Sequence, residues 1–320
     1  VGESNLENSG VKLFRNHEKM GKMGLNPSII YNHLRLGIDI INYLKNDFKP
    51  DLVLLVDYGA FNLQISKQLK KAGIKTFYFI PPQIWASRKW RLNTIKKNVD
   101  KVLTIFPFEK EFYDKEGINC EYVGHPILSE IKKQNKKEEF FRKHNLDINK
   151  KLIGVFPGSR IFEIKFLLKI FISHAKSLSD NVFRVPYRTV RGENHELLEY
   201  SDALILASGS VALEAAMFKT PMIIAYKGPL LFYLIYLLVR NIKRACLVNI
   251  ITGKDYIKEF LMYDAKAEKI ADEINEILDN KEKRDYIIEG CSKTIELLDN
   301  RNCIENVANI IFKELSEEEK

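Results

Sequence analysis

The chain has 320 residues, which is enough to bury two hydrophobic cores of ordinary size. Hydrophobic residues make up 46% and charged residues 29%, a balance that excludes an intrinsically disordered chain and a bundle of membrane-spanning helices. The formal net charge of +8 favours partners that carry phosphate, among them anionic lipid, nucleic acid and phosphorylated substrates, without choosing among them.

The four cysteines are widely spaced and form no Cys-x-x-Cys pair, so they predict a reducing, cytoplasmic location. The sequence opens at Val1 with neither an initiator methionine nor a basic segment followed by an apolar one. We therefore expect further residues upstream and no export signal. The longest apolar run, residues 230–239, is far shorter than the ~20 residues that a helix needs to cross a bilayer, and no membrane span is predicted.

The first half of the chain alternates β-rich runs with helical periodicity. Predicted strands cover residues 52–56, 75–80, 101–106 and 120–123, and predicted helices cover residues 62–72, 90–99 and 109–115. This alternation is typical of a parallel sheet covered by helices. The turn Gly124-His125-Pro126 interrupts it, and a polar stretch, residues 132–138, follows.

The alternation restarts after the polar stretch. Strands are predicted at residues 152–156, 203–207 and 221–226, with helices at 163–178 and 211–218. From Asp264 the pattern is helical, with Ile270, Ile274 and Ile277 on one face, and it ends in an acidic tail. The sequence thus predicts an α/β protein with a first domain at residues 1–130, a second at 131–265 and C-terminal helices at 266–320.

Ligands of doubly wound sheets bind beyond the carboxyl ends of the strands, so the residues that follow each predicted strand are the first candidates for a site. Asp57 ends the apolar run 52–56. A turn carboxylate or a helix cap would explain it, and so would a general base that accepts the proton of a sugar hydroxyl. His125, between the first two predicted domains, is either structural or a donor to a diphosphate or leaving group.

Two turns of the second domain have the composition of phosphate sites. Pro157-Gly158-Ser159-Arg160 precedes the helix that carries Glu163; glycine lets a backbone approach a phosphate, and a guanidinium can bind two phosphate oxygens. Ala207-Ser208-Gly209-Ser210 leads into a helix in which Glu214 could accept hydrogen bonds from ribose hydroxyls. Ordinary strand-to-helix turns are the alternative for both segments.

The apolar segment 229–239 is followed by three cations. A helix of this kind can lie in the headgroup layer of a membrane, and a buried core helix with a charged end is the alternative. The aromatic and basic stretch 85–91 could stack on nucleic-acid bases or hold an acidic lipid headgroup. The candidate membrane contacts are Leu230, Phe232, Tyr233, Leu237, Arg240 and Lys243.

Taken in order, these segments resemble the lipid-A-disaccharide synthase family. The stretch from Lys49-Pro50-Asp51 through Asp57 to Phe61-Asn62 is similar to the family's Lys-Pro-Asp strand, acidic residue and Phe-Asn pair. Pro82-Gln83-Ile84-Trp85-Ala86, with Arg88 and Arg91, resembles its Pro-Ser-Val-Trp-Ala-Trp-Arg segment. The resemblance covers about residues 1–260, and so many ordered matches are hard to obtain by chance. Further matches are Phe106-Pro107-Phe108-Glu109, Gly124-His125-Pro126, the turns at 157–163 and 207–214, and Asn249 with Gly253.

The resemblance implies a GT-B fold, in which two Rossmann-like domains face each other across a cleft and a UDP-sugar is held mainly by the second. It implies the inverting transfer of 2,3-diacylglucosamine from UDP to 2,3-diacylglucosamine 1-phosphate, a step of lipid A biosynthesis, without a metal or another cofactor. Acylated substrates imply a peripheral enzyme on the anionic inner face of the inner membrane. Neither a nucleic-acid partner nor a particular oligomeric state is implied.

With the roles that the resemblance implies, Asp57 is the candidate base and His125 the second candidate catalytic residue. The candidate substrate-binding residues are Asn62, Trp85, Arg88 and Arg91. The candidate UDP site consists of Gly158, Ser159, Arg160, Glu163, Ser208, Gly209, Ser210, Glu214 and Asn249.

Several features depart from the family pattern. The family opens with a strand and helix joined by a glycine-rich loop, which we expect to precede Val1. Ala60 stands in place of a second acidic residue, Val248 in place of a proline, and the stretch between Arg160 and Ala207 is short.

These departures leave alternatives open. One is another UDP-sugar enzyme of the same fold, such as a peptidoglycan-precursor N-acetylglucosamine transferase or a UDP-N-acetylglucosamine epimerase. The second is a degenerate nucleotide- or lipid-binding protein without turnover. A nucleic-acid role is the third, and the alternation of acids and bases at 136–143 and 268–283 argues against it.

Overall fold

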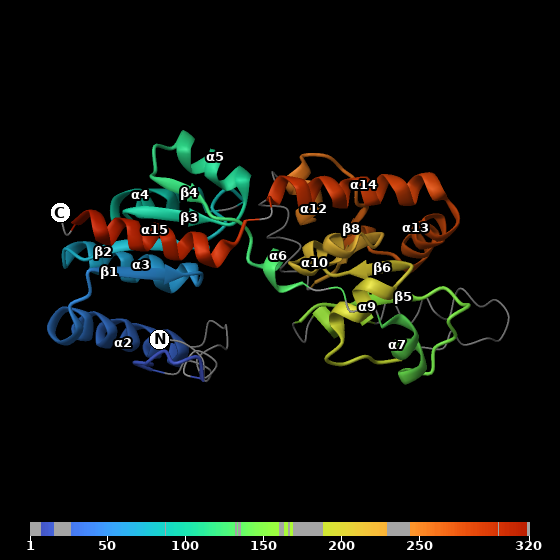
Figure 1. The fold of residues 1–320 in the computed structure, drawn as a ribbon, viewed down its shortest axis with the longest axis horizontal. Helices are drawn as coiled ribbons and strands as arrows, with labels where there is room; N and C mark the ends of the chain where they lie inside the picture. Colours follow the sequence, from blue (N-terminus) through green and yellow to red (C-terminus); the bar gives the residue numbers. More distant parts are fainter. Residues whose placement is uncertain are drawn as a thin grey trace. The chain divides into compact units, whose positions relative to one another are not determined.

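The computed structural model describes residues 8–15, 27–86, 88–131, 133, 136–159, 163–165, 167–168, 188–228, 244–299 and 301–318 (Figure 1). These residues form two four-stranded sheets with helices around them, so the predicted α/β class is confirmed. The chain divides into two compact units, one of Val1–Ile84 with Arg88–Leu103 and one of Trp85–Ser87 with Thr104–Lys320.

The first sheet has the strand order β1-β2-β3-β4. Its strands are β1 (Leu52–Val56), β2 (Lys75–Phe79), β3 (Lys101–Thr104) and β4 (Cys120–Tyr122). β1 pairs with β2, and β2 with β3, in parallel. β2 and β3 bury every residue but the first, as strands covered on both faces do. Because β1, β2 and β3 run in one direction, the turns after them lie along one edge of the sheet.

Helices α3 (Gly59–Lys71) and α4 (Leu92–Asn98) connect these strands, with the 3₁₀ turn Lys89–Arg91 before α4. α3 buries Leu63, Ser66 and Leu69, which follow helical spacing, together with Ile65, and exposes Lys70 and Lys71 at its end. α5 (Pro107–Lys115) follows β3 and begins at a proline, the residue best suited to a first helical position. α2 (Pro27–Tyr43) and the π-helical turn Leu44–Phe48 precede β1, in a stretch without a predicted element.

The second sheet has the strand order β5-β6-β7-β8. Its strands are β5 (Ile153–Phe156), β6 (Ala203–Leu206), β7 (Met222–Tyr226) and β8 (Glu259–Leu261), and the three pairings are parallel. β6 is buried along its whole length and β7 along its first four residues. These two strands are therefore the centre of the hydrophobic core of this sheet.

Helices surround the second sheet: α9 (Asn194–Tyr200), α10 (Val211–Phe218), α12 (Leu247–Thr252), α13 (Ala267–Asp279) and α14 (Lys281–Leu298). The predicted apolar face of Ile270, Ile274 and Ile277 is buried on α13, as expected. The short helices α6 (Ile127–Glu130) and α7 (Lys137–Lys143) follow the Gly-His-Pro turn. The last helix, α15 (Cys303–Glu318), lies beside the end of β4, where the Asn306 amide donates to the Val123 carbonyl at 3.0 Å (Figure 1).

Some element boundaries differ from the sequence prediction. The strand predicted at 75–80 ends at Phe79 because Ile80 adopts a positive φ of 54°, which turns the chain away from the sheet. The strand predicted at 101–106 ends at Thr104, and the helix predicted at 163–178 lies partly outside the described residues. Within the described ranges, no helix combines the length and the apolarity needed to span a bilayer.

Candidate functional site

The turn after β1 holds Asp57 and Tyr58 in the left-handed conformation, with φ values of 46° and 45°. Each such residue costs about 1 kcal/mol or more when it is not glycine, so the turn needs hydrogen bonds to persist. The carbonyl of Asp57 accepts from the Asn62 amide at 2.8 Å and from the Tyr78 hydroxyl at 2.8 Å. Its N–H donates to Phe79 at 3.0 Å. Three hydrogen bonds thus fix the backbone of Asp57, while its side chain is exposed to solvent.

Neighbouring side chains complete this turn. The Tyr58 hydroxyl lies 2.5 Å from Nε2 of His33, which projects from α2. Gly59 packs against Pro82 so closely that an added Cβ would lie 2.7 Å from the Cβ of the proline. The loop that begins at Pro81 therefore lies against the turn after β1, and glycine is required where they meet.

Two candidate substrate residues follow that loop. Arg88 is exposed with a φ of 60°, and its carbonyl accepts from the Arg91 N–H at 2.9 Å. Burial, together with the charge of Arg88, lowers the pKa of Arg91, while Tyr78 acts in the opposite direction. Burial and the nearby charge of Asp57 raise the pKa of Tyr78. Asp57, Tyr78 and Arg91 thus interact electrostatically at one edge of the first sheet.

Glu109, on α5, is the functional candidate that sequence reasoning missed. Its carboxylate is buried and accepts from the Trp85 indole N–H at 3.1 Å. Its other oxygen, Oε2, is the buried side-chain atom that has no hydrogen-bond partner among the described residues. Burial raises the pKa of Glu109 to about 7, even though the Trp85 hydrogen bond favours the charged form. The Phe106-Pro107-Phe108-Glu109 motif was the signal that could have identified it.

Trp85, Phe106 and Phe108 form an aromatic cluster, and the His125 ring lies against it, with its centroid 5.1 Å from that of Phe106. It is buried, and this burial lowers its pKa to about 4, so the ring is neutral at neutral pH. The Ile127 N–H donates to Nδ1 at 3.2 Å, which leaves the ring proton on Nε2. Gly124 has a φ of 96°, a conformation that favours glycine and turns the chain into the histidine. The arrangement makes His125 a hydrogen-bond donor.

The turn after β5 brings Gly158 and Glu163 together. Gly158 has a φ of 100°, and an added Cβ would lie 2.5 Å from Oε2 of Glu163. Glu163 is buried, whereas Ser159 is exposed. The Glu163 side chain therefore covers the glycine from one side. Arg160, the residue predicted to bind a diphosphate, lies outside the described residues.

The turn after β6 is open. Gly209 and Ser210 are exposed, and an added Cβ on Gly209 would have nothing within 4 Å. Ser208 donates its hydroxyl to the carbonyl of Ala245 at 3.0 Å. α10 begins directly after Ser210, and the N–H groups of Ala212, Leu213 and Glu214 bond back to the carbonyls of Gly209 and Ser210. Because Phe156 lies opposite Leu206 in the sheet, the turns after β5 and β6 are neighbours.

Glu214, in the first turn of α10, is half-buried, and this burial raises its pKa. Its Oε2 lies 3.7 Å from Nε2 of His195, on α9. The sequence prediction named Glu214 but not His195, since a lone histidine among acidic residues gives no pattern. The structure therefore adds an imidazole neighbour for this carboxylate.

Asn249 is buried, and protein groups satisfy its amide. Its Nδ2 donates to the Ile257 carbonyl and to the Glu259 carboxylate, each at 2.8 Å, and its Oδ1 accepts from the Ile257 N–H at 2.9 Å. Glu259 also accepts from the N–H groups of Ala245 and Cys246, at 2.8 and 3.0 Å. Asn249 and Glu259 therefore fix the loop whose Ala245 carbonyl receives Ser208.

The candidate residues that the structure describes thus fall into two sets, one near the carboxyl ends of the strands of each sheet. The six candidate membrane contacts, Leu230, Phe232, Tyr233, Leu237, Arg240 and Lys243, lie outside the described residues, as Arg160 does. Over the described part of the chain, no group of three or more His, Cys, Asp or Glu residues is arranged to hold a metal ion.

Comparison with known proteins gives consistent matches. A family model described as lipid-A-disaccharide synthetase matches residues 1–187 and 182–311. A lipid-A-disaccharide synthase from Syntrophus aciditrophicus is 33% identical over 91% of this chain and 83% of that protein. A lipid-A-disaccharide synthase from Coxiella burnetii is 33% identical over 97% of this chain and 89% of that protein. Among solved structures, a UDP-GlcNAc 2-epimerase from Neisseria meningitidis bound to UDP-GlcNAc has a TM-score of 0.63 at 12% identity, covering 96% of this chain and 87% of its own.

Proposed function

The chain belongs to the lipid-A-disaccharide synthetase family and is a glycosyltransferase of that type, and we propose that the turns at the strand ends of its two sheets carry the reaction. In this reaction 2,3-diacylglucosamine passes from UDP to 2,3-diacylglucosamine 1-phosphate, and UDP is released. The observation that carries the assignment is the family match through residues 1–187 and 182–311. The epimerase shares the fold at 12% identity, which gives no support for an epimerase activity.

We place the UDP moiety of the donor at the turns after β5 and β6. The open backbone at Gly209 leaves room for a diphosphate, and the partial positive charge at the start of α10 favours its negative charge. Glu214, held near His195, is positioned to accept from ribose hydroxyls. Arg160 follows Ser159 directly in sequence and is the proposed cation for the diphosphate.

Asp57 is the proposed general base. A sugar hydroxyl is a weak nucleophile, and a carboxylate that accepts its proton during attack typically accelerates such a step ~100-fold or more. The acceptor oxygen forms the new bond to the anomeric carbon, the bond from that carbon to the UDP oxygen breaks, and the proton passes to Asp57. The exposed carboxylate on a rigid backbone supports this role, because a base must be fixed relative to its substrate.

Trp85, Glu109 and His125 support the reaction from the segments that follow β2, β3 and β4. The Nε2–H of a neutral His125 can donate to the leaving diphosphate or to a sugar oxygen. Glu109 orients the Trp85 indole, whose flat face suits a sugar ring. Asn62 contributes indirectly, since its amide holds the carbonyls of Val56 and Asp57.

We propose a peripheral position on the inner face of the inner membrane. Both substrates carry acyl chains, which stay in a bilayer, so the enzyme must meet them at its surface. The segment 229–243 is proposed as one contact, with its cations meeting lipid phosphate.

The transferase activity is tested by incubating the purified chain with UDP-2,3-diacylglucosamine and 2,3-diacylglucosamine 1-phosphate in detergent micelles. We expect mass spectrometry to detect the tetraacyl disaccharide 1-phosphate together with an equal amount of UDP. UDP without disaccharide would contradict the transferase, since it would report hydrolysis. Tight UDP binding with neither product would favour a binding protein without turnover.

A further inference from the structure

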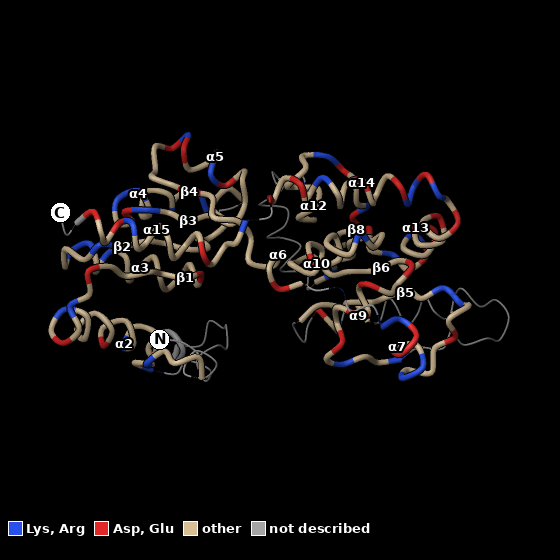
Figure 2. Tube along the Cα trace, in the orientation of Figure 1, with Lys and Arg blue, Asp and Glu red and all other residues tan. Residues whose placement is uncertain are grey.

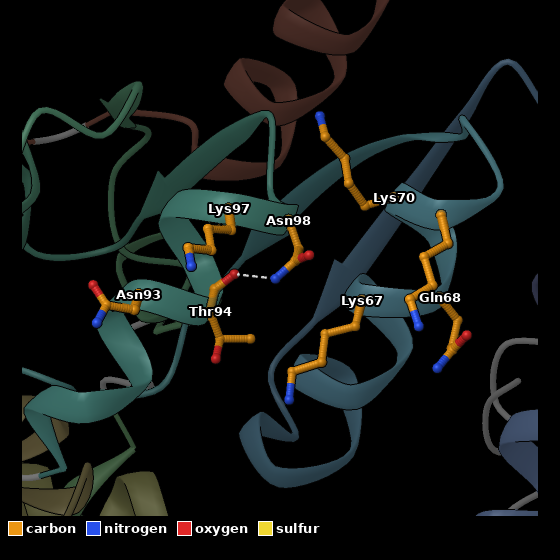
Figure 3. Close-up of a pocket in the computed structure, with 8 residues that line it drawn as sticks. Lys67, Gln68, Lys70, Asn93, Thr94, Lys97 and Asn98 are labelled. Atoms are coloured by element: carbon orange, nitrogen blue, oxygen red, sulfur yellow. Dashed lines mark hydrogen bonds between the residues drawn. The ribbon is translucent and has the colours of Figure 1, made fainter.

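A basic groove lies between α3 and α4, on a surface that the proposed site does not use (Figure 3). Its volume is about 510 Å³. Lys67, Lys70 and Lys71 line it from α3, and Lys97 lines it from α4. The other side chains of the lining are amides and one hydroxyl, and none of the lining residues is acidic. The groove therefore presents cations and hydrogen-bond donors to solvent.

The charge of this region is one-sided over a long stretch of sequence. Residues 58–99 contain nine Lys or Arg and no Asp or Glu, although 42 of the 320 residues of the chain are acidic. Both signs occur along α13 and α14, which is typical of a solvated surface (Figure 2). Asp100, at the border of the stretch, pairs with Lys70 at 2.8 Å. A run without carboxylates creates a positive field that attracts anions.

An exposed tryptophan extends the groove. Trp90 is 69% exposed and lies with the Arg91 guanidinium 5.3 Å from its ring centroid. A smaller hollow of about 40 Å³, which Ala60 and Trp90 line, shares Lys67 and Thr94 with the groove. The basic surface thus runs from Ala60, three residues after Asp57, to the end of α3. Tryptophan beside cations is the composition of surfaces that sit at the headgroup level of a bilayer.

We propose that this surface of α3 and α4 docks the protein on anionic phospholipid. The proposal rests on the proposed function in one respect, because acylated substrates supply the reason to meet a bilayer. Phospholipid phosphates match the lysines of the groove, and Trp90 inserts its ring among the headgroups. Since the surface begins next to the Asp57 turn, docking brings the candidate base to the plane in which the acceptor lies.

The test is co-sedimentation with vesicles of phosphatidylcholine, with and without phosphatidylglycerol, at low salt. The triple variant Lys67→Gln, Lys71→Gln and Lys97→Gln is compared with a control triple, Lys150→Gln, Lys258→Gln and Lys281→Gln, which changes the net charge equally at exposed positions elsewhere. We expect the first to bind phosphatidylglycerol vesicles about 100-fold more weakly than the wild type, and the control within about threefold. Trp90→Ala should also weaken binding.

Circular dichroism checks that each variant is folded, and turnover in detergent micelles should stay within about twofold of the wild type, because these lysines lie outside the proposed site. Equal vesicle binding by the two triple variants would overturn the proposal, and so would equal binding to vesicles that lack phosphatidylglycerol. Single-stranded RNA that binds more tightly than the vesicles and displaces them would overturn it in favour of nucleic acid. Because vesicle binding requires no turnover, its result is separate from that of the transferase assay.

Discussion

The turns at the carboxyl edges of the two sheets are built on opposite principles. Along the first sheet, Asp57 and Tyr58 occupy unfavourable backbone conformations that hydrogen bonds from the Asn62 and Tyr78 side chains hold in place. Along the second, the turn after β6 consists of small residues with open space above Gly209. A catalytic carboxylate needs a fixed position, whereas a diphosphate needs room and N–H donors. The comparison suggests that the first edge performs the proton transfer and the second holds the nucleotide.

The largest expected effect is that of Asp57→Asn. Loss of the base should lower kcat by about 100-fold to 10,000-fold without changing the fold, because the exposed side chain contributes little to stability. Steady-state rates of disaccharide formation measure it. Asp47→Asn, at an exposed position before β1, is the control and should keep its rate. Wild-type turnover by the Asp57→Asn variant would contradict the assignment of Asp57 as the general base.

The buried carboxyl of Glu109 should make the stability of the folded protein depend on pH. Burial raises its pKa from the ordinary 4.5 to about 7 in the folded protein, so the folded state binds the proton more tightly. Stability from this group is therefore present at low pH and is lost as pH rises from 4.5 to 7, by about 3 kcal/mol in total. Glu109→Gln should remove this loss.

Urea unfolding at pH 5 and pH 8 measures the effect of Glu109. Relative to the wild type, the Glu109→Gln variant should gain stability at pH 8 but not at pH 5. Glu111→Gln, at an exposed position of the same helix, should show no such difference. Identical pH profiles for the two variants would mean that the Glu109 carboxylate is not desolvated.

A pair of glycine substitutions compares the packing of the two edges. Gly59→Ala should destabilise the protein by about 1–3 kcal/mol, because its Cβ would lie 2.7 Å from Pro82. Gly209→Ala should change stability by less than about 0.5 kcal/mol, because nothing lies within 4 Å of its Cβ. Chemical denaturation of the two variants checks this. Equal effects would mean that the two turns are packed alike.

Tyr78→Phe should have the smaller of the two effects expected on turnover. It removes one of the two side-chain hydrogen bonds to the Asp57 carbonyl, which is worth about 1 kcal/mol. We expect kcat to fall by roughly tenfold with the KM for the donor unchanged, because the base is displaced and the donor site is not. Tyr286→Phe, whose hydroxyl contacts the Asp255 carbonyl at 3.4 Å, is the control. A change confined to KM would contradict the positioning role.

The sequence predicted the parallel α/β class and the order of the motifs well, because strand-to-helix alternation and the turns after strands depend on local residues. It could not predict that Glu109 is buried beside Trp85, since the two are 24 residues apart and only the fold brings them together. Asn249 shows the same limit. Its position in a motif suggested a ligand contact, whereas its amide is bonded to the backbone of Ile257 and to Glu259. The α2 helix begins at Pro27, a residue suited to the first helical position, and the sequence prediction did not use this signal.

The division of work between the two edges is tested most directly by isothermal titration calorimetry with UDP on Asp57→Asn and Gly209→Ala. We expect Asp57→Asn to bind UDP within about twofold of the wild type, and Gly209→Ala to bind it about tenfold more weakly, because its methyl group would occupy space proposed for the diphosphate. The opposite pattern, with UDP affinity lost at Asp57 and kept at Gly209, would contradict the account.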